Sequence, residues 1–452
     1  MPDISVVIAV IGLLAVAAVG RLLEKTWIAP GAFFALCWAM FTVFTVSGPL
    51  VGVEKYDVWH GSIWWIVLTI SFIIAGSVSG RIVGGWHPVS GARDLKESDF
   101  PRAVPLMAVC AASGIAWPIL VPQLVAWGDH PPMYLQVLLG LHYTGPLFGG
   151  IAYACATSRR FRWLALSTLI PGIVFGVLDT GRTKIASQFE FWFAGYFAAQ
   201  IYLRARPFRL FSVSRVLAGI ATGLLFVAAG VLFTPWRGVP RDTPLEEKLT
   251  LYWEMTDRKQ LAESWEWMHS SIFGQLAGFS WYFEHALANP PRPKFPENTF
   301  AGIYRAFGGE LGEPIYTDIG GISTNIFTIF KPPIEDYTLP GSLVVAFLFG
   351  FASGWAYGKV RSGTMWPMVI VMHSYVEAMG IGGWFFTYNS VTGAFVVLGI
   401  YLKYVQRLKT DRKADRLWRP SRLAVQEASP RLRLTAAPQL SRHTSEPRVF
   451  RL

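Results

Sequence analysis

The sequence predicts an all-α polytopic membrane protein with one large external loop. Of its 452 residues, 52% are hydrophobic and only 15% are charged, and the mean hydropathy is +0.38. A water-soluble chain of this length and balance would aggregate. Apolar stretches of about 17 to 25 residues recur between short polar turns, and this is the length that an α-helix needs to cross a bilayer. Because backbone groups in hydrocarbon must pair within their own segment, we expect helices and not strands.

About eleven spans are expected on this length criterion. The first stretch lacks the basic segment of a signal peptide, and further spans follow at once, so we expect it to be retained as a helix. The spans are expected to begin near Ile4, Pro30, Ser62, Val104, Met133, Arg162, Ile185, Ser214, Gly341, Trp366 and Ser390.

Lysine and arginine concentrate in one set of connections, which the positive-inside rule assigns to the cytoplasm. The opposite set is nearly free of basic residues. We therefore expect a bacterial inner-membrane protein with a periplasmic N-terminus and a cytoplasmic C-terminus. The basic set comprises Arg21 and Lys25, the segments 81–102, 159–162 and 204–215, and Lys359 with Arg361.

These spans divide the chain into four parts. Eight helices over 1–233 precede a periplasmic loop over 234–340, three helices follow over 341–405, and a basic tail occupies 406–452. A loop that far exceeds the usual 2 to 8 residues between helices is normally functional. The Pro/Ser/Arg-rich tail is expected to be disordered and attracted to anionic lipid head groups, not to nucleic acid.

The first half of the loop carries an apolar stripe at steps of three, four or eight, which predicts helices. Two interpretations remain open: the helices lie along the outer membrane interface, or they pack on the helical bundle. Four prolines between 290 and 296 then break the pattern. The stripe consists of Leu249, Trp253, Leu261, Trp265, Met268, Ile272, Leu276, Phe279, Phe283 and Leu287.

Arg182 and Lys184 are predicted to lie on the outer side of the membrane, whereas lysine and arginine usually concentrate on the cytoplasmic side. They stand at the predicted N-terminus of a span, which is a poor place for cations structurally and a good place to hold phosphate. The alternative is a local salt bridge from Arg182 to Asp179 or Glu190.

A second cluster of polar residues runs from 298 to 337, among glycines that allow tight backbone approaches. Charged, amide, hydroxyl and aromatic groups just above a membrane suit a sugar attached to a lipid. The cluster contains Arg305, Glu310, Glu313, Tyr316, Asp318, Asn325, Thr328, Lys331, Glu335 and Asp336.

The histidines show neither an HExxH motif nor close pairing, so we expect no metal centre. His373 and Glu377 stand four apart in the tenth predicted span and would share one helix face. An intramembrane ionisable pair suggests function, but a structural hydrogen bond explains it equally well.

At three stretches the sequence resembles the Wzy-type O-antigen and oligosaccharide repeat unit polymerases. Residues 30–50 are similar to the second span of that family, and Gly181 to Lys184 are similar to its external arginine turn. The segment from Thr324 to Gly341 resembles its Asn-x-(Tyr/Phe)-Thr element and the acidic-aromatic-Gly element that follows. The spacing from Asp336 to Gly341 is longer than is common in the family.

The resemblance implies a glycosyltransferase of GT-C-like architecture in lipopolysaccharide biosynthesis, without metal or cofactor. It would join undecaprenyl-diphosphate-linked oligosaccharides at the periplasmic face, working in the bilayer beside a chain-length regulator and a flippase. Arg182 and Arg305, with Lys184 or Lys331, would hold the diphosphate. Glu310, Glu335 or Asp336 would accept the proton of the acceptor hydroxyl. Substrate contacts would also come from Tyr316, Asn325 and Thr328.

Two alternative functions remain open. An O-antigen ligase would use the same donor lipid but transfer the glycan to lipid A core, with His269 or His285 as its loop histidine. A transporter or flippase would often show two repeated halves. The predicted division into eight spans and three favours an enzyme.

Overall fold

The computed structural model describes the chain in segments. The described residues are 3–48, 57–85, 95–126, 133–178, 182–203, 247, 250, 274–295, 297–301, 304, 317–319, 322–324, 328–380 and 389–418. For 117–126, 133–139, 175–178, 182–184, 317–319, 322–324, 389–390 and 412–418 the backbone alone is described.

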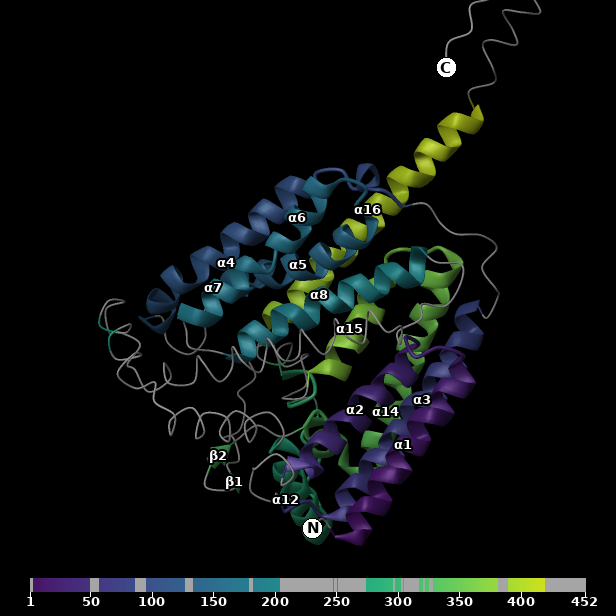
Figure 1. Cartoon of the computed structure of the whole chain (residues 1–452), viewed down its shortest axis with the longest axis vertical. Coiled ribbons are helices and arrows are strands. Elements are labelled where there is room, and N and C mark those ends of the chain that lie inside the picture. Colours follow the sequence, from purple (N-terminus) through teal and green to yellow (C-terminus); the bar gives the residue numbers. More distant parts are fainter. Residues whose placement is uncertain are drawn as a thin grey trace, which may run out of the picture. The chain divides into compact units, whose positions relative to one another are not determined.

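Helices occupy ten of the eleven predicted span positions, and the eighth position, near Ser214, lies outside the described residues (Figure 1). Of the described helices, α1, α3 and α14 are long and apolar enough to cross a membrane. The helices at these positions are α1 (Ile4–Glu24), α2 (Pro30–Val46), α3 (His60–Gly85), α4 (Ala103–Ala126), α5 (Met133–Cys155), α6 (Arg159–Ser167), α7 (Ile170–Leu178), α8 (Arg182–Leu203), α14 (Lys331–Ser362), α15 (Met368–Met379) and α16 (Asn389–Trp418).

The sixth predicted span is not one helix but two, α6 and α7, separated at Thr168 and Leu169. Pro171 explains the break, because a proline in the first turn of α7 has no N–H to donate to the preceding turn. The hydroxyl of Thr168 donates to the carbonyl oxygen of Ala165 at 2.7 Å, which occupies one acceptor at the end of α6.

Helices α3 and α14 pack with their backbones in direct contact. Along α3, Gly76, Gly80 and Gly84 face the backbone of α14, and Gly350 and Gly354 of α14 face the backbone of α3. A Cβ at Gly80 or at Gly354 would lie only 2.0 Å from a carbonyl oxygen of the other helix. Glycines four residues apart on both helices let two membrane helices approach this closely.

Helix α12 (Gln275–Ala288) is the described part of the stripe in the long loop, and it packs on α3. Phe279 and Phe283 are buried, and the ring of Phe283 lies 5.9 Å from Trp59 and 5.3 Å from Trp65. The hydroxyls of Ser62 and Ser280 share a hydrogen bond. For this segment the interpretation as a helix packed on the bundle is the correct one, whereas residues 251–273 lie outside the described part of the chain.

The helix that contains the ninth span begins before the span that the sequence predicts. Helix α14 starts at Lys331, ten residues before Gly341, and it bends at Thr338, whose φ is 66°. Pro340 accounts for the bend, because it has no N–H and its ring clashes with the carbonyl group four residues back. The segment 331–337 is thus a separate helical stretch, set at an angle to the apolar remainder of α14.

Two further elements depart from the sequence prediction. Strands β1 (Thr317–Ile319) and β2 (Ile322–Thr324) in the long loop pair in antiparallel fashion. Residues 1–406 form one unit and 407–452 a second, and α16 continues to Trp418, so the first part of the predicted tail is helical.

Replacing Gly80 or Gly354 with leucine should force α3 and α14 apart, because no side chain fits between the two backbones. Overpacking of this kind costs about 1 to 3 kcal/mol. We expect a lower melting temperature and an aggregated fraction on size exclusion in detergent. Ala75→Leu is the matched control, since Ala75 is exposed on the same helix. Equal losses in the control and the glycine variants would contradict this account of the interface.

Candidate functional site

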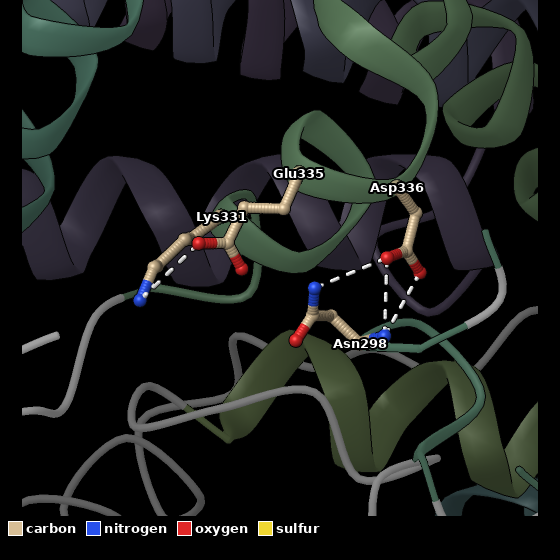
Figure 2. Close-up of polar contacts among 4 residues, drawn as sticks. All are labelled: Asn298, Lys331, Glu335 and Asp336. Atoms are coloured by element: carbon tan, nitrogen blue, oxygen red, sulfur yellow. Dashed lines mark hydrogen bonds and ion pairs between the residues drawn. The ribbon is translucent and has the colours of Figure 1, made fainter. Parts of the chain in front are cut away.

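A polar cluster forms where the long loop enters α14 (Figure 2). Lys331 and Glu335 lie one turn apart, with 3.6 Å between the Lys331 Nζ and a Glu335 carboxylate oxygen. Their side chains are only 13% and 12% exposed. The pair is therefore largely screened from solvent, in contrast to an ordinary surface ion pair.

Asp336, the next residue, faces the loop instead. Its carboxylate accepts hydrogen bonds from the backbone N–H and the side-chain amide of Asn298 (Figure 2). It also accepts one from the backbone N–H of Thr299. The Asp336 side chain is 1% exposed. A second tie runs from the backbone N–H of Lys294 to the carbonyl oxygen of Glu335 at 3.3 Å. Asp336 thus holds the 294–299 segment against α14, and its oxygens are already occupied by donors.

Helix α12 contributes Tyr282 to the cluster. The Lys331 ammonium lies 5.4 Å from the centre of the Tyr282 ring, within the range of a cation–π interaction. Burial raises the pKa of the Tyr282 phenol, and the nearby carboxylates of Glu335 and Asp336 raise it further. Tyr282 therefore stays neutral at physiological pH and keeps an O–H that can donate.

The cluster can bind an anion and move a proton. Burial lowers the pKa of the Lys331 ammonium, and the nearby charge of Glu335 opposes this shift. Burial raises the pKa of the Glu335 carboxyl, and the nearby charges of Lys331 and the exposed Lys294 oppose it. Glu335 is the carboxylate whose oxygens are not held by backbone donors in the described contacts. A phosphate group bound by the lysines would therefore lie beside a carboxylate that can accept a proton.

The structure brings together three of the predicted site residues, Lys331, Glu335 and Asp336. Thr328 lies just before them, is buried, and accepts a hydrogen bond from the Lys331 N–H through its carbonyl oxygen. Arg305, Glu310, Tyr316 and Asn325 lie outside the described residues, and only the backbone is described for Arg182 and Lys184, in the first turn of α8.

The sequence analysis does not single out two members of this cluster, Tyr282 and Lys294, and it includes Asn298 only as the first residue of the polar segment. A signal for the loop segment is present, because Asn-Thr two residues after the last proline of the break is typical of a turn. Tyr282, in α12, lies 49 residues before Lys331 in the sequence. Only the packing of α12 on the bundle brings the two together.

The predicted pair in α15 also lies as expected on one helix face. His373 Nε2 is 3.2 Å from a carboxylate oxygen of Glu377, and Glu377 is fully buried. The His373 ring lies 6.4 Å from Phe349 and 5.1 Å from Phe395. Within the described segments no three His, Cys, Asp or Glu side chains form a group that could hold a metal ion.

No protein-family model, curated protein or solved structure matches this chain.

Replacing Asp336 with alanine should release the 297–300 segment while the helical bundle stays folded. The backbone N–H groups of Asn298 and Thr299 lose their acceptor, and each buried unsatisfied donor costs about 1 to 3 kcal/mol. We expect faster hydrogen exchange in a peptide that covers these two amides, measured by mass spectrometry. Glu335→Ala is the matched control, because that neighbouring carboxylate pairs with Lys331. Unchanged exchange in Asp336→Ala would show that Asp336 does not hold the segment.

Proposed function

We propose that this protein is a polymerase of lipid-diphosphate-linked oligosaccharide repeat units in a bacterial inner membrane. It would transfer the growing glycan from its undecaprenyl diphosphate to the end of a new lipid-linked unit. The observation that carries the proposal is the cluster of Lys331, Lys294 and Glu335 at the head of a long apolar helix. A diphosphate leaving group on a membrane lipid needs cations next to the bilayer, and glycosyl transfer needs a proton acceptor.

The position of the cluster along α14 supports a periplasmic site. At the far end of α14, Arg81 of α3 stacks on Tyr357 and donates to the carbonyl oxygen of Glu24. Arg81, Lys359 and Arg361 belong to the basic set that the positive-inside rule assigns to the cytoplasm. The polar cluster is at the opposite end of the same helix, so the same rule assigns it to the periplasm.

Each residue has a distinct role in this proposal. Lys331 and Lys294, together with Arg182 and Arg305, stabilise the negative charge that develops on the departing diphosphate, without a metal. Glu335 accepts the proton of the acceptor hydroxyl. Asp336 is a positioning residue, because its carboxylate is engaged by the 298–299 backbone. Of the three acidic candidates that the sequence leaves equivalent, the hydrogen bonds to Asp336 therefore favour Glu335 over Asp336, and Glu310 lies outside the described residues.

The test is synthesis by the purified protein. Full-length protein in proteoliposomes, given lipid-diphosphate-linked repeat units and EDTA, should produce a ladder of lengthening glycans. Arg182→Ala, Lys331→Ala and Glu335→Gln should each reduce the rate about 10²- to 10³-fold, as for other groups that stabilise a transition state. Lys359→Ala is the matched control, because it removes a lysine from the opposite end of α14.

Three results would overturn the proposal. Normal ladders from stably inserted Arg182→Ala and Lys331→Ala proteins would rule out the diphosphate-holding role of these cations. Transfer of glycan only to lipid A core would identify a ligase. Movement of the lipid across the membrane without glycan transfer would identify a flippase.

A further inference from the structure

A basic surface forms where the connection before α4 meets the start of α6. Glu97 belongs to the short 3-10 helix η2 (Glu97–Asp99) in this connection. Its carboxylate accepts hydrogen bonds from the backbone N–H groups of Thr157 and Ser158 and from the Ser158 hydroxyl, each at 3.1 Å. These bonds hold residues 96–99 against the N-terminus of α6, so cations from two distant parts of the chain come together.

The start of α6 carries three exposed arginines, Arg159, Arg160 and Arg162. They stand in the first turn of the helix, where the positive end of the helix dipole disfavours cations. Among the side chains of α6, Ala165 is the buried one, so the arginines do not pack the helix onto the bundle. Their position is therefore unfavourable for the helix itself, and an anion that binds them would relieve it.

Residues 95–102 balance their own charge and do not neutralise the arginines. Two exposed cations, Lys96 and Arg102, accompany the two carboxylates Glu97 and Asp99. The Asp99 carboxylate accepts a hydrogen bond from the Lys96 backbone N–H at 3.1 Å. The hydrogen bond from the Ser158 N–H lowers the pKa of Glu97, so that carboxylate is charged and engaged by the backbone. The arginines of α6 are thus an excess of positive charge on this surface.

Trp163 places these cations at the level of the lipid head groups. It follows Arg162 directly and is 61% exposed, and Ile170, at the start of α7, is 56% exposed. Exposed tryptophans of membrane helices concentrate at the boundary between hydrocarbon and water. Arg159 lies four residues before Trp163, which is about 6 Å along the helix axis. Because arginine side chains extend along apolar surface towards the head groups, the guanidinium groups can reach the phosphates of the surrounding lipids.

We propose that this α6 surface, formed by Arg159, Arg160 and Arg162 with Lys96 and Arg102, binds the phosphates of an anionic phospholipid in the cytoplasmic leaflet. Arginine grips a phosphate through two parallel hydrogen bonds, which a zwitterionic surface satisfies less well. Two groups of cations on one surface match a lipid with two phosphates, such as a diphosphatidylglycerol, better than a lipid with one. The site lies on the face that the positive-inside rule assigns to the cytoplasm, and it does not depend on the proposed polymerase activity.

The test is native mass spectrometry of the full-length protein in detergent, titrated with defined lipids. Diphosphatidylglycerol should bind most tightly, phosphatidylglycerol less tightly and phosphatidylethanolamine at least tenfold more weakly than the first. Each cation beside an anionic head group contributes about a fivefold gain in affinity. The triple variant Arg159→Gln/Arg160→Gln/Arg162→Gln should therefore bind diphosphatidylglycerol about 100-fold more weakly.

A matched triple variant removes the same charge from elsewhere on the same face. Arg21→Gln/Lys25→Gln/Lys359→Gln changes basic residues at the cytoplasmic ends of α1 and α14, and it should keep the affinity of the unmodified protein. If the α6 variant fails to insert, Lys96→Gln/Arg102→Asn tests the other half of the surface. Asparagine suits position 102 because Arg102 has a φ of 59°, and this double variant should bind about 25-fold more weakly.

Three outcomes would overturn the proposal. Equal losses in the α6 variant and the matched variant would show that only the total charge of the face matters. Inorganic pyrophosphate binding as tightly as diphosphatidylglycerol would assign the surface to a soluble phosphate compound instead of a lipid. Undiminished lipid affinity in both the α6 variant and the double variant would exclude a lipid site and leave the surface to an acidic cytoplasmic partner.

Discussion

The contact between the backbones of α3 and α14 is the constraint on which the rest of this structure depends. Where the glycines of the two helices lie, backbone faces backbone without an intervening side chain, so the register of α14 against α3 is constrained by direct backbone contact. The head of α14 is then fixed beside Trp59 and Trp65, where α12 docks through Phe283. The polar cluster forms between α14 and α12, which both pack on α3. A shift of one turn along the interface would move Lys331 about 5 Å away from Tyr282.

The bend at Thr338 separates two kinds of environment within one helix. From Thr338 to Ser362 the helix is long enough to extend about 36 Å, which matches a hydrocarbon core of about 30 Å with its boundary. The seven residues before the bend carry both charged members of the Lys331–Glu335 pair and Asp336. A threonine with positive φ is a strained conformation that the surroundings must enforce. The ties from Asp336 to the 298–299 backbone supply such enforcement just outside the membrane part.

The lengths of the apolar stretches could predict which residues form the helices, because every helix that crosses a bilayer needs about the same number of apolar residues. It could not predict their partners. The four-residue spacing of Gly76, Gly80 and Gly84 is readable in the sequence, but its partner glycines are 270 residues further along the chain. The same limit applies to the site. Lys331, Glu335 and Asp336 could be predicted because they are adjacent in sequence. Tyr282 could not, because only packing joins it to them.

The charge arrangement at the head of α14 runs against the preferences of an isolated helix. Lys331 stands in the first turn, where the positive end of the helix dipole repels a cation, and a Lys that precedes Glu by four residues is the weaker orientation of an ion pair. Asp336, by contrast, stabilises the fold through its bonds to the loop. The largely buried Lys331 is held in this position by contacts from outside its own helix, because its ammonium lies 5.4 Å from the centre of the Tyr282 ring of α12.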